Sequence, residues 1–256
     1  MFPVLFHIRE TPIHSYGFFI AVGYVAALLL LSRLAKLRNL DPAKFLDLAF
    51  LALVTGVIGG RILFVLTNIP YFSRYPGEIF DFWQGGLVFY GGFLLALASC
   101  AIYIRRKQLP FAESLDLLAP ALSLGHAFGR IGCLAAGCCY GSYCELPWAV
   151  HLHSDLVDPA LRGLPLHPTQ LYESVSLFLL TAVLVYLIKR RALRPGGTAL
   201  LYVMAYSVIR AVIEIFRGDG IRGFLIGNWF STSQGIAAAL FLLGGFIFMR
   251  RFRRNH

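Results

Sequence analysis

The sequence predicts an all-α integral membrane protein with seven transmembrane helices. We expect the N-terminus outside, the C-terminus in the cytoplasm and a small cap domain on the outer face. Three observations support this fold class. The 256-residue chain is 58% hydrophobic and only 14% charged, with a mean hydropathy of +0.70, whereas soluble domains carry about 25% charged residues. It also contains seven apolar runs of spanning length, and its basic residues gather in alternate loops.

The apolar runs are long enough to cross a hydrocarbon layer, which takes about 20 helical residues for roughly 30 Å. We expect helices because lipid offers the backbone no hydrogen-bond partners. The expected spans lie at about 17–36, 46–68, 87–104, 114–135, 170–188, 198–216 and 231–249.

The basic residues decide the predicted orientation. Fifteen lysines and arginines, from Arg33 to Arg254, follow the first, third and fifth runs or close the chain. The positive-inside rule therefore places those segments in the cytoplasm. This distribution makes the formal net charge of +10 a topology signal and argues against a nucleic-acid partner. The opposite side holds five arginines, Arg9, Arg74, Arg162, Arg217 and Arg222.

The chain is expected to form a single polytopic membrane domain over residues 1–256. Its first residues lack the basic region and the small-residue cleavage site of a signal peptide, so we expect the first helix to be retained. The long outer segment 136–169 contains prolines, a tryptophan and two aspartates, which favours a small folded cap on the periplasmic side. Any chemistry is expected near the outer leaflet.

Five charged residues lie within or at the ends of the apolar runs: Arg61, Arg130, Glu173, Arg210 and Glu214. A charge at the bilayer centre costs roughly 2.5–3.5 kcal/mol, so such residues pair with one another or line a polar cavity. One interpretation is structural ion pairs, such as Arg210 with Glu214 one helical turn later. The other is a site for an anionic headgroup, since arginine binds phosphate through two parallel hydrogen bonds.

Five sequence motifs resemble those of prolipoprotein diacylglyceryl transferases, and they occur in the family's order over nearly the whole chain. The entry of the first helix, HSYG, and the glycine-rich segment GGLVFYGG are similar to family segments. GRIGCLAAGCCYG resembles the family signature, LHPTQLYES the His-Pro-Thr-Gln-Leu-Tyr-Glu motif, and YSVIRAVIEIFRGD the sixth helix.

This resemblance implies a reaction. Family members transfer the diacylglyceryl group of phosphatidylglycerol to the lipobox cysteine thiol of an exported prolipoprotein, forming a thioether and releasing glycerol phosphate. The expected partners are therefore phosphatidylglycerol, the lipobox segment of a prolipoprotein signal peptide, and membrane lipid. The implied location is the bacterial inner membrane with the active site toward the periplasm. No cofactor and no metal are expected.

The resemblance also implies roles for individual residues. Arg130 matches the signature arginine that holds the lipid phosphate, and Tyr206 and Arg210 match an essential pair in the sixth helix. Glu173 and Glu214 match acidic positions that hold arginines in place. The further residues expected to contact substrate are Tyr16, Arg61, Gly141, Gln170 and Tyr172.

The chain departs from the family pattern at three positions. Tyr90 stands where the glycine-rich segment has a histidine, Cys133 where the signature has an asparagine, and Cys138 where it has a carboxylate. A phenol is a poorer base than an imidazole at neutral pH. His126, one turn before Arg130, could supply the missing imidazole, or it could be a packing histidine.

The cysteines allow three interpretations. Cys133, Cys138, Cys139 and Cys144 lie within twelve residues on the predicted outer face, and Cys100 is expected to be buried filler. They could form disulfides, bind a metal together with His126, His151 or His153, or include a reactive thiol at Cys138.

Two alternatives to the family's reaction remain open. The chain could be a divergent paralog that uses another acceptor or performs thiol-redox chemistry at the cysteines. It could also bind or transport lipid without catalysis.

Overall fold

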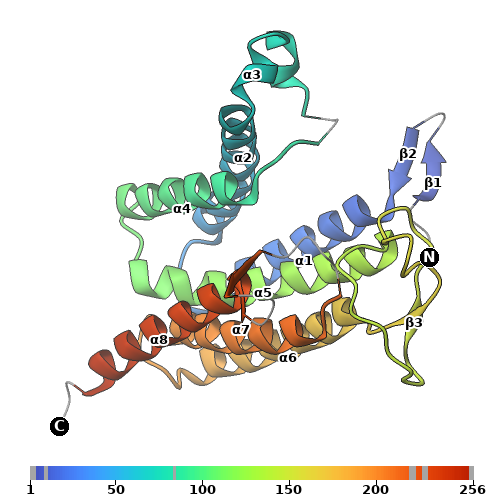
Figure 1. The fold of residues 1–256 in the computed structure, drawn as a ribbon. Coiled ribbons are helices and arrows are strands. Elements are labelled where there is room, and N and C mark those ends of the chain that lie inside the picture. Colours follow the sequence, from blue (N-terminus) through green and yellow to red (C-terminus); the bar gives the residue numbers. More distant parts are fainter. Residues whose placement is uncertain (1–3, 9–10, 83–84, 219–222, 227–229, 254–256) are drawn as a thin grey trace. The chain divides into compact units, whose positions relative to one another are not determined.

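The computed structural model describes the chain apart from residues 1–3, 9–10, 83–84, 219–222, 227–229 and 254–256. Four residues considered in the sequence analysis, Arg9, Asp219, Arg222 and Arg254, lie outside the described residues. The helices dominate the structure, as predicted (Figure 1).

Six helices of the described chain are long and apolar enough to cross a membrane. They are α1 (Ser15–Leu37), α2 (Pro42–Thr67), α5 (Phe111–Ala136), α6 (Thr169–Arg190), α7 (Gly197–Phe216) and α8 (Thr232–Arg253). The seventh expected span, 87–104, forms α4 (Phe89–Arg106). This helix has 18 residues and is not among the six, because it begins later than expected and its last two residues are arginines.

The chain divides into two compact units. The first comprises residues 1–30 and 115–256, and the second comprises residues 31–114. The sequence predicted one domain and contains no composition change that would mark this division.

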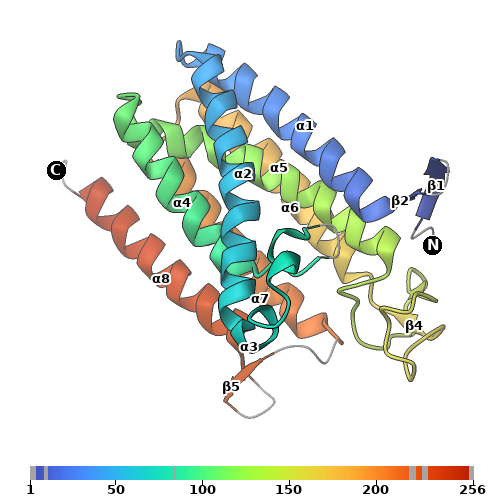
Figure 2. The ribbon, with the colours of Figure 1, turned by 90° about the horizontal axis from the view of Figure 1, so that it is seen from above.

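Helices α5, α6 and α7 run side by side in the first unit (Figures 1 and 2). Small and branched side chains form their shared core, where Ala119, Leu180 and Leu184 are buried against residues of α7. Two hydroxyl groups add hydrogen bonds across α5 and α6: Ser123 Oγ to the Leu177 carbonyl at 3.0 Å, and Ser174 Oγ to the Ala127 carbonyl at 2.9 Å. Such bonds let helices associate where lipid provides no hydrophobic drive.

A carboxylate on α5 fixes the start of α7. Asp116 is buried, and its two oxygens accept hydrogen bonds from the backbone amides of Gly196 at 2.6 Å and Ala199 at 2.8 Å. The first amides of a helix have no partner within the helix, and a negative charge is favoured at that end. Asp116 therefore acts as a cap supplied from another helix.

The start of α8 is capped by its own sequence. Ser231 Oγ accepts from the Gln234 amide at 3.2 Å, and Gln234 Oε1 accepts from the Ser231 amide at 3.1 Å. This reciprocal pair is a capping box. It sets where α8 begins to run along α7.

Short strands occur outside the long helices, which the all-α prediction did not include. In the part of the chain that the structure describes there are three sheets, and each is an antiparallel pair. The pairs are β1 (Val4–Ile8) with β2 (Thr11–His14), β3 (Val150–His151) with β4 (Pro165–Leu166), and β5 (Phe224–Ile226) with β6 (Phe230–Ser231).

The segment between α5 and α6, residues 137–168, has a small core of its own. Tyr140, Leu152, Val157 and Leu166 are buried together there. The Tyr140 hydroxyl also accepts a hydrogen bond from the Asp158 amide at 3.0 Å. This is the segment that the sequence predicted to be a folded cap.

The second unit is built on the packing of α2 against α4 (Figure 2). It also contains α3 (Ile69–Phe72) and the short helix η1 (Pro76–Phe80). The two long helices approach each other through glycines: a Cβ at Gly92 would lie 2.5 Å from the Gly56 carbonyl oxygen. A Cβ at Gly56 would meet nothing within 4 Å.

This asymmetry yields a first prediction. Gly92→Ala should destabilise the protein by about 1–3 kcal/mol, because the added methyl forces the backbones of α2 and α4 apart. Gly56→Ala, on the other side of the same contact, is the matched control and should be neutral. Thermal unfolding in detergent measures both. Equal midpoints for the two variants would contradict the close approach.

Candidate functional site

Three side chains from α5 and α7 surround one buried carboxylate on α6 in the first unit. Glu173 on α6 is 2% exposed. Its Oε2 lies 3.0 Å from Nε of Arg130 on α5, and its Oε1 accepts a hydrogen bond from the Tyr206 hydroxyl of α7 at 3.2 Å. Nε2 of His126 lies 3.6 Å from the same Oε1. These four residues were named separately from the sequence, and the fold brings them together.

His126 and Arg130 are also in direct contact. Arg130 Nε donates to His126 Nε2 at 3.3 Å. Because that nitrogen accepts, the imidazole is neutral in this arrangement. The His126 ring packs against the edge of the Tyr206 ring with centroids 5.3 Å apart. His126 thus packs against Tyr206 and also belongs to the polar cluster.

A second ion cluster lies further along α7. Arg210 Nη2 is 2.6 Å from Glu214 Oε2, which confirms the pair expected one helical turn apart. Arg217 Nη1 reaches the same oxygen at 3.9 Å. Arg210 Nη2 also donates to Ser233 Oγ of α8 at 3.1 Å.

One donor of Arg210 remains available. Its Nη1 is buried and has no hydrogen-bond partner among the described residues. A buried donor without a partner is unfavourable. This nitrogen therefore marks a place where a ligand oxygen would be stabilised.

The signature segment ends α5 in a Schellman turn. Gly137 has φ of +82°, a conformation that glycine adopts without steric cost. The Cys138 amide donates to the Cys133 carbonyl at 3.0 Å, and the Gly137 amide donates to the Leu134 carbonyl at 3.2 Å. This pair of bonds is the Schellman pattern. It folds the chain back over the last turn of α5.

The first turn of α6 holds the returning chain in place. Thr169 Oγ1 donates to the Cys139 carbonyl at 2.9 Å, and Gln170 Nε2 donates to the Cys138 carbonyl at 2.7 Å. Both polar side chains are almost fully buried. Gln170, which is expected to contact substrate, thus bonds to the backbone that follows the helix of Arg130.

Gly141 lies where three segments of backbone meet. Its amide donates to the His167 carbonyl at 3.0 Å. A Cβ at this position would come within 2.6 Å of that oxygen and 2.8 Å of the Phe216 carbonyl oxygen. Only glycine fits, so the structure gives Gly141 a packing role. Tyr172 lies in the same region, where its hydroxyl accepts from Trp148 Nε1 at 2.8 Å.

The cysteine thiols lie next to this cluster. All five cysteines are free, so the disulfide interpretation is not realised. The Sγ atoms of Cys133, Cys138 and Cys139 lie within 4.8 Å of one another. Hydrogen bonds from the Cys133 and Cys138 thiols, with nearby Arg130, hold the pKa of Cys139 below its ordinary value. Cys138, the thiol expected to be reactive, lies beside Cys139 in this group.

Tyr16 borders the same region from α1. Its ring and carbonyl lie 3.3 Å from the position of a Cβ on Gly132. Its hydroxyl is near enough to interact electrostatically with Arg130 and the three thiols. Tyr16 is 44% exposed, so it can be reached from outside the cluster.

Arg61 belongs to the second unit, and its guanidinium group donates hydrogen bonds to main-chain carbonyls. Nε donates to Ile79 at 2.9 Å and Nη1 to Gly85 at 2.8 Å, while Nη2 donates to Glu78. Its guanidinium also lies 5.5 Å from the Phe64 ring centroid. This environment indicates that Arg61 supports the loop before the glycine-rich segment. Tyr90, in α4 of the same unit, is 57% exposed.

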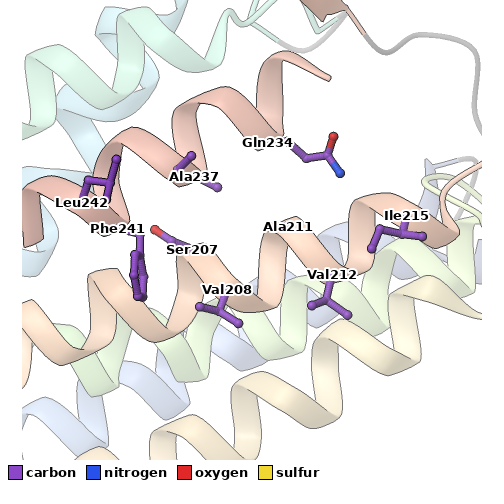
Figure 3. Close-up of a pocket in the computed structure, with 10 residues that line it drawn as sticks. Ser207, Val208, Ala211, Val212, Ile215, Gln234, Ala237, Phe241 and Leu242 are labelled. Atoms are coloured by element: carbon purple, nitrogen blue, oxygen red, sulfur yellow. The ribbon is translucent and has the colours of Figure 1, made fainter. Parts of the chain in front are cut away.

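An apolar groove of about 480 Å³ lies between α7 and α8 (Figure 3). Val208, Val212 and Ile215 line it from α7, and Phe241 and Leu242 line it from α8. It begins beside Gln234 and runs along the helices. Arg210 belongs to the same stretch of α7 and bonds to Ser233, which precedes Gln234.

Comparison with known proteins gives consistent matches. Residues 3–250 match the family described as prolipoprotein diacylglyceryl transferase. A phosphatidylglycerol–prolipoprotein diacylglyceryl transferase of Clostridium tetani is 36% identical over 256 residues, covering all of both chains. The protein of that name from Finegoldia magna is 33% identical over 241 residues, which is 94% of this chain and 92% of the relative.

The buried carboxylate gives a second prediction. Glu173→Gln removes the counter-charge of Arg130, and breaking a buried ion pair in this way costs about 3–5 kcal/mol. Its matched control is Glu145→Gln, because Glu145 is exposed and bonds only to the Tyr143 hydroxyl among the described contacts. Chemical or thermal unfolding in detergent should separate the two variants clearly. A Glu173→Gln variant as stable as wild type would refute the central role of this carboxylate.

Proposed function

The chain belongs to the prolipoprotein diacylglyceryl transferase family, and we propose that it performs the family's reaction. It transfers the diacylglyceryl group of phosphatidylglycerol to the lipobox cysteine thiol of an exported prolipoprotein. A thioether forms and glycerol phosphate leaves. The observation that carries this proposal is the convergence of Arg130, Glu173, His126 and Tyr206 from three helices.

The arginines would bind the anionic part of the donor lipid. Arg130 and Arg210 are fixed by Glu173 and Glu214, so their guanidinium groups are oriented before substrate arrives. The free Nη1 of Arg210 can donate to a phosphate oxygen. Preorganised donors of this kind stabilise the negative charge that develops as the leaving group departs.

The groove between α7 and α8 would hold one acyl chain of the donor. Its lining is mostly apolar, and one end lies beside Gln234 (Figure 3), next to Ser233, which accepts a hydrogen bond from Arg210. This arrangement suits a lipid whose headgroup reaches the arginine. The acyl chain would then remain in an environment as apolar as the interior of the bilayer. This arrangement supports phosphatidylglycerol as the substrate.

The acceptor thiol needs a base or a positive field, because the thiolate is the nucleophile. We assign this task to the field of the surrounding arginines and to His126, whose Nε2 would take the thiol proton once Arg130 gives up its bond to that nitrogen and turns to the lipid phosphate. Tyr206, bonded to Glu173, would keep the carboxylate oriented. Cys138 and Tyr16 lie at the margin of the same site, where they would contact the incoming segment.

The location follows from the charge pattern and the reaction. We place the protein in the bacterial inner membrane with seven spans, α4 included, and with the C-terminus in the cytoplasm. The segment 137–168 then forms an outer cap over the lipobox segment of the prolipoprotein, and the active site faces the periplasm. Its own small core supports a folded cap.

The direct test is transfer of labelled diacylglyceryl from phosphatidylglycerol to a lipobox peptide by purified protein in detergent. Arg130→Lys keeps the charge but loses the guanidinium geometry, and we expect the rate to fall by about 100-fold or more. Arg162→Lys is the control, because Arg162 pairs with the exposed carboxylate of Asp155 at 3.1 Å. Absence of labelled thioether from wild-type protein that still binds the lipid would sink the proposed function.

The acyl groove gives a separate kinetic prediction. Ala238→Phe should fill the groove and raise KM for phosphatidylglycerol, while KM for the peptide stays unchanged. The matched control is Ala239→Phe, because Ala239 is also exposed on α8 but does not line the groove. If both variants behave alike, the groove does not hold the donor lipid.

A further inference from the structure

Three cysteine thiols converge where α5 ends. The Sγ atoms of Cys133, Cys138 and Cys139 lie within 4.8 Å of one another, and among the described residues the group contains no other cysteine, histidine or carboxylate. Cys133 is buried, whereas Cys138 and Cys139 are half-buried. The proposed transferase function uses these thiols for no chemical step of its own.

The backbone holds the thiols together. The Schellman turn at Gly137 returns Cys138 to Cys133, and hydrogen bonds from α6 fix the carbonyls of Cys138 and Cys139. Cys139 has φ of +58°, which is unfavourable for a residue with a side chain. The surrounding bonds thus maintain a strained conformation that brings a third thiol into the group.

Convergent thiols are ligands for soft metal ions. Zn–S bonds of about 2.3 Å separate the sulfurs of a tetrahedral site by roughly 3.8 Å, so the thiols need to close by at most about 1 Å. Three protein ligands leave one position open, as in catalytic zinc sites. A divalent ion with three thiolates carries one net negative charge, and Arg130 and Arg217 lie near enough to compensate it.

We propose that Cys133, Cys138 and Cys139 form a three-thiolate site for a zinc-class metal ion whose open position takes the acceptor cysteine thiol. The second part rests on the proposed transferase function. A thiol that coordinates the metal releases its proton to solvent and is held as the nucleophilic thiolate. This activation would add to the one assigned to His126, in a chain that has Tyr90 where the family pattern has a histidine.

The transfer step then balances as a displacement. The new C–S bond forms between the acceptor sulfur and the glyceryl carbon, while the C–O bond from that carbon to the phosphate breaks. Glycerol phosphate leaves with the electron pair of that bond, beside the arginines. The thioether sulfur is uncharged and a weaker ligand than a thiolate, so the product leaves the metal. No oxidation or reduction occurs.

The first test of this site uses cobalt as a spectroscopic probe. Full-length protein in detergent, reduced and freed of metal, is titrated with Co²⁺. We expect one equivalent to produce thiolate-to-cobalt charge transfer and tetrahedral d–d bands, which Zn²⁺ then removes. Cys133→Ser, Cys138→Ser and Cys139→Ser should each weaken binding by roughly 10-fold or more.

The matched control is Cys144→Ser, because Cys144 and Cys133 are buried alike at 8% and 9% exposed. This variant should retain the wild-type spectrum. Wild-type protein without charge-transfer bands, or an equal loss in Cys144→Ser, would overturn the metal site. Thermal unfolding of each variant shows that a lost spectrum does not come from lost folding.

The second test examines the open position. Cobalt-loaded protein receives a lipobox peptide or the same peptide with serine in place of its cysteine. The cysteine peptide alone should shift the d–d bands, and an identical response to both peptides would overturn the role of the acceptor thiol as fourth ligand. Failure of the transferase function is distinguishable, since metal-loaded protein would then make no thioether whatever its spectrum.

Discussion

The first unit depends on a single buried carboxylate. Glu173 is enclosed by α5, α6 and α7 and balances Arg130, which could not otherwise lie between apolar helices. The same carboxylate accepts from Tyr206 and lies beside His126. One side chain thus links three helices and orients the residues that we assign to the reaction.

The position of Glu173 depends in turn on the start of its helix. Thr169 and Gln170 bind the backbone carbonyls of Cys139 and Cys138, which fixes the first turn of α6 to the end of α5. Glu173 follows Gln170 by three residues and therefore faces the same neighbour, where Arg130 lies. The motif LHPTQLYES thus contains both the residues that anchor the start of α6 and the carboxylate that compensates the charge of Arg130. A substitution at Thr169 that moved the first turn of α6 would therefore also move Glu173 relative to Arg130.

Sequence patterns predicted the parts of this fold that depend on local spacing. The apolar runs located the long helices, and the interval of four residues predicted the pair Arg210–Glu214. The pair Arg130–Glu173 joins two helices, and no spacing within one helix specifies the register between two. For the same reason Asp116 gave no sequence signal as the cap of α7, eighty residues away from Gly196.

Arg61 shows why an arginine in an apolar run does not by itself indicate a ligand. In the sequence, Arg61 and Arg210 are alike, since each is an arginine in an apolar run. In the structure, the nitrogens of Arg61 donate to the carbonyls of Glu78, Ile79 and Gly85. Arg210, in contrast, retains a buried donor without a partner among the described residues. What separates the two is the number of donors left after folding, which depends on loops distant in sequence. A guanidinium with a donor left over can stabilise a ligand oxygen, and one with its donors used stabilises the loop around it.

The cysteine group likewise depends on how the chain folds and not on the sequence spacing of its members. Their spacing in the sequence matches no familiar metal motif. If α5 continued through residue 138, the side chains of Cys133 and Cys138 would point to different faces of the helix. The left-handed turn at Gly137 reverses the chain and converts that spacing into contact. The known metal-ligand motifs reflect the turns that commonly bring ligands together. A site formed at the C-cap of a helix has a different spacing, so these motifs do not detect it in the sequence. The chemistry of this end of α5 is therefore decided by one glycine that has no reactive group.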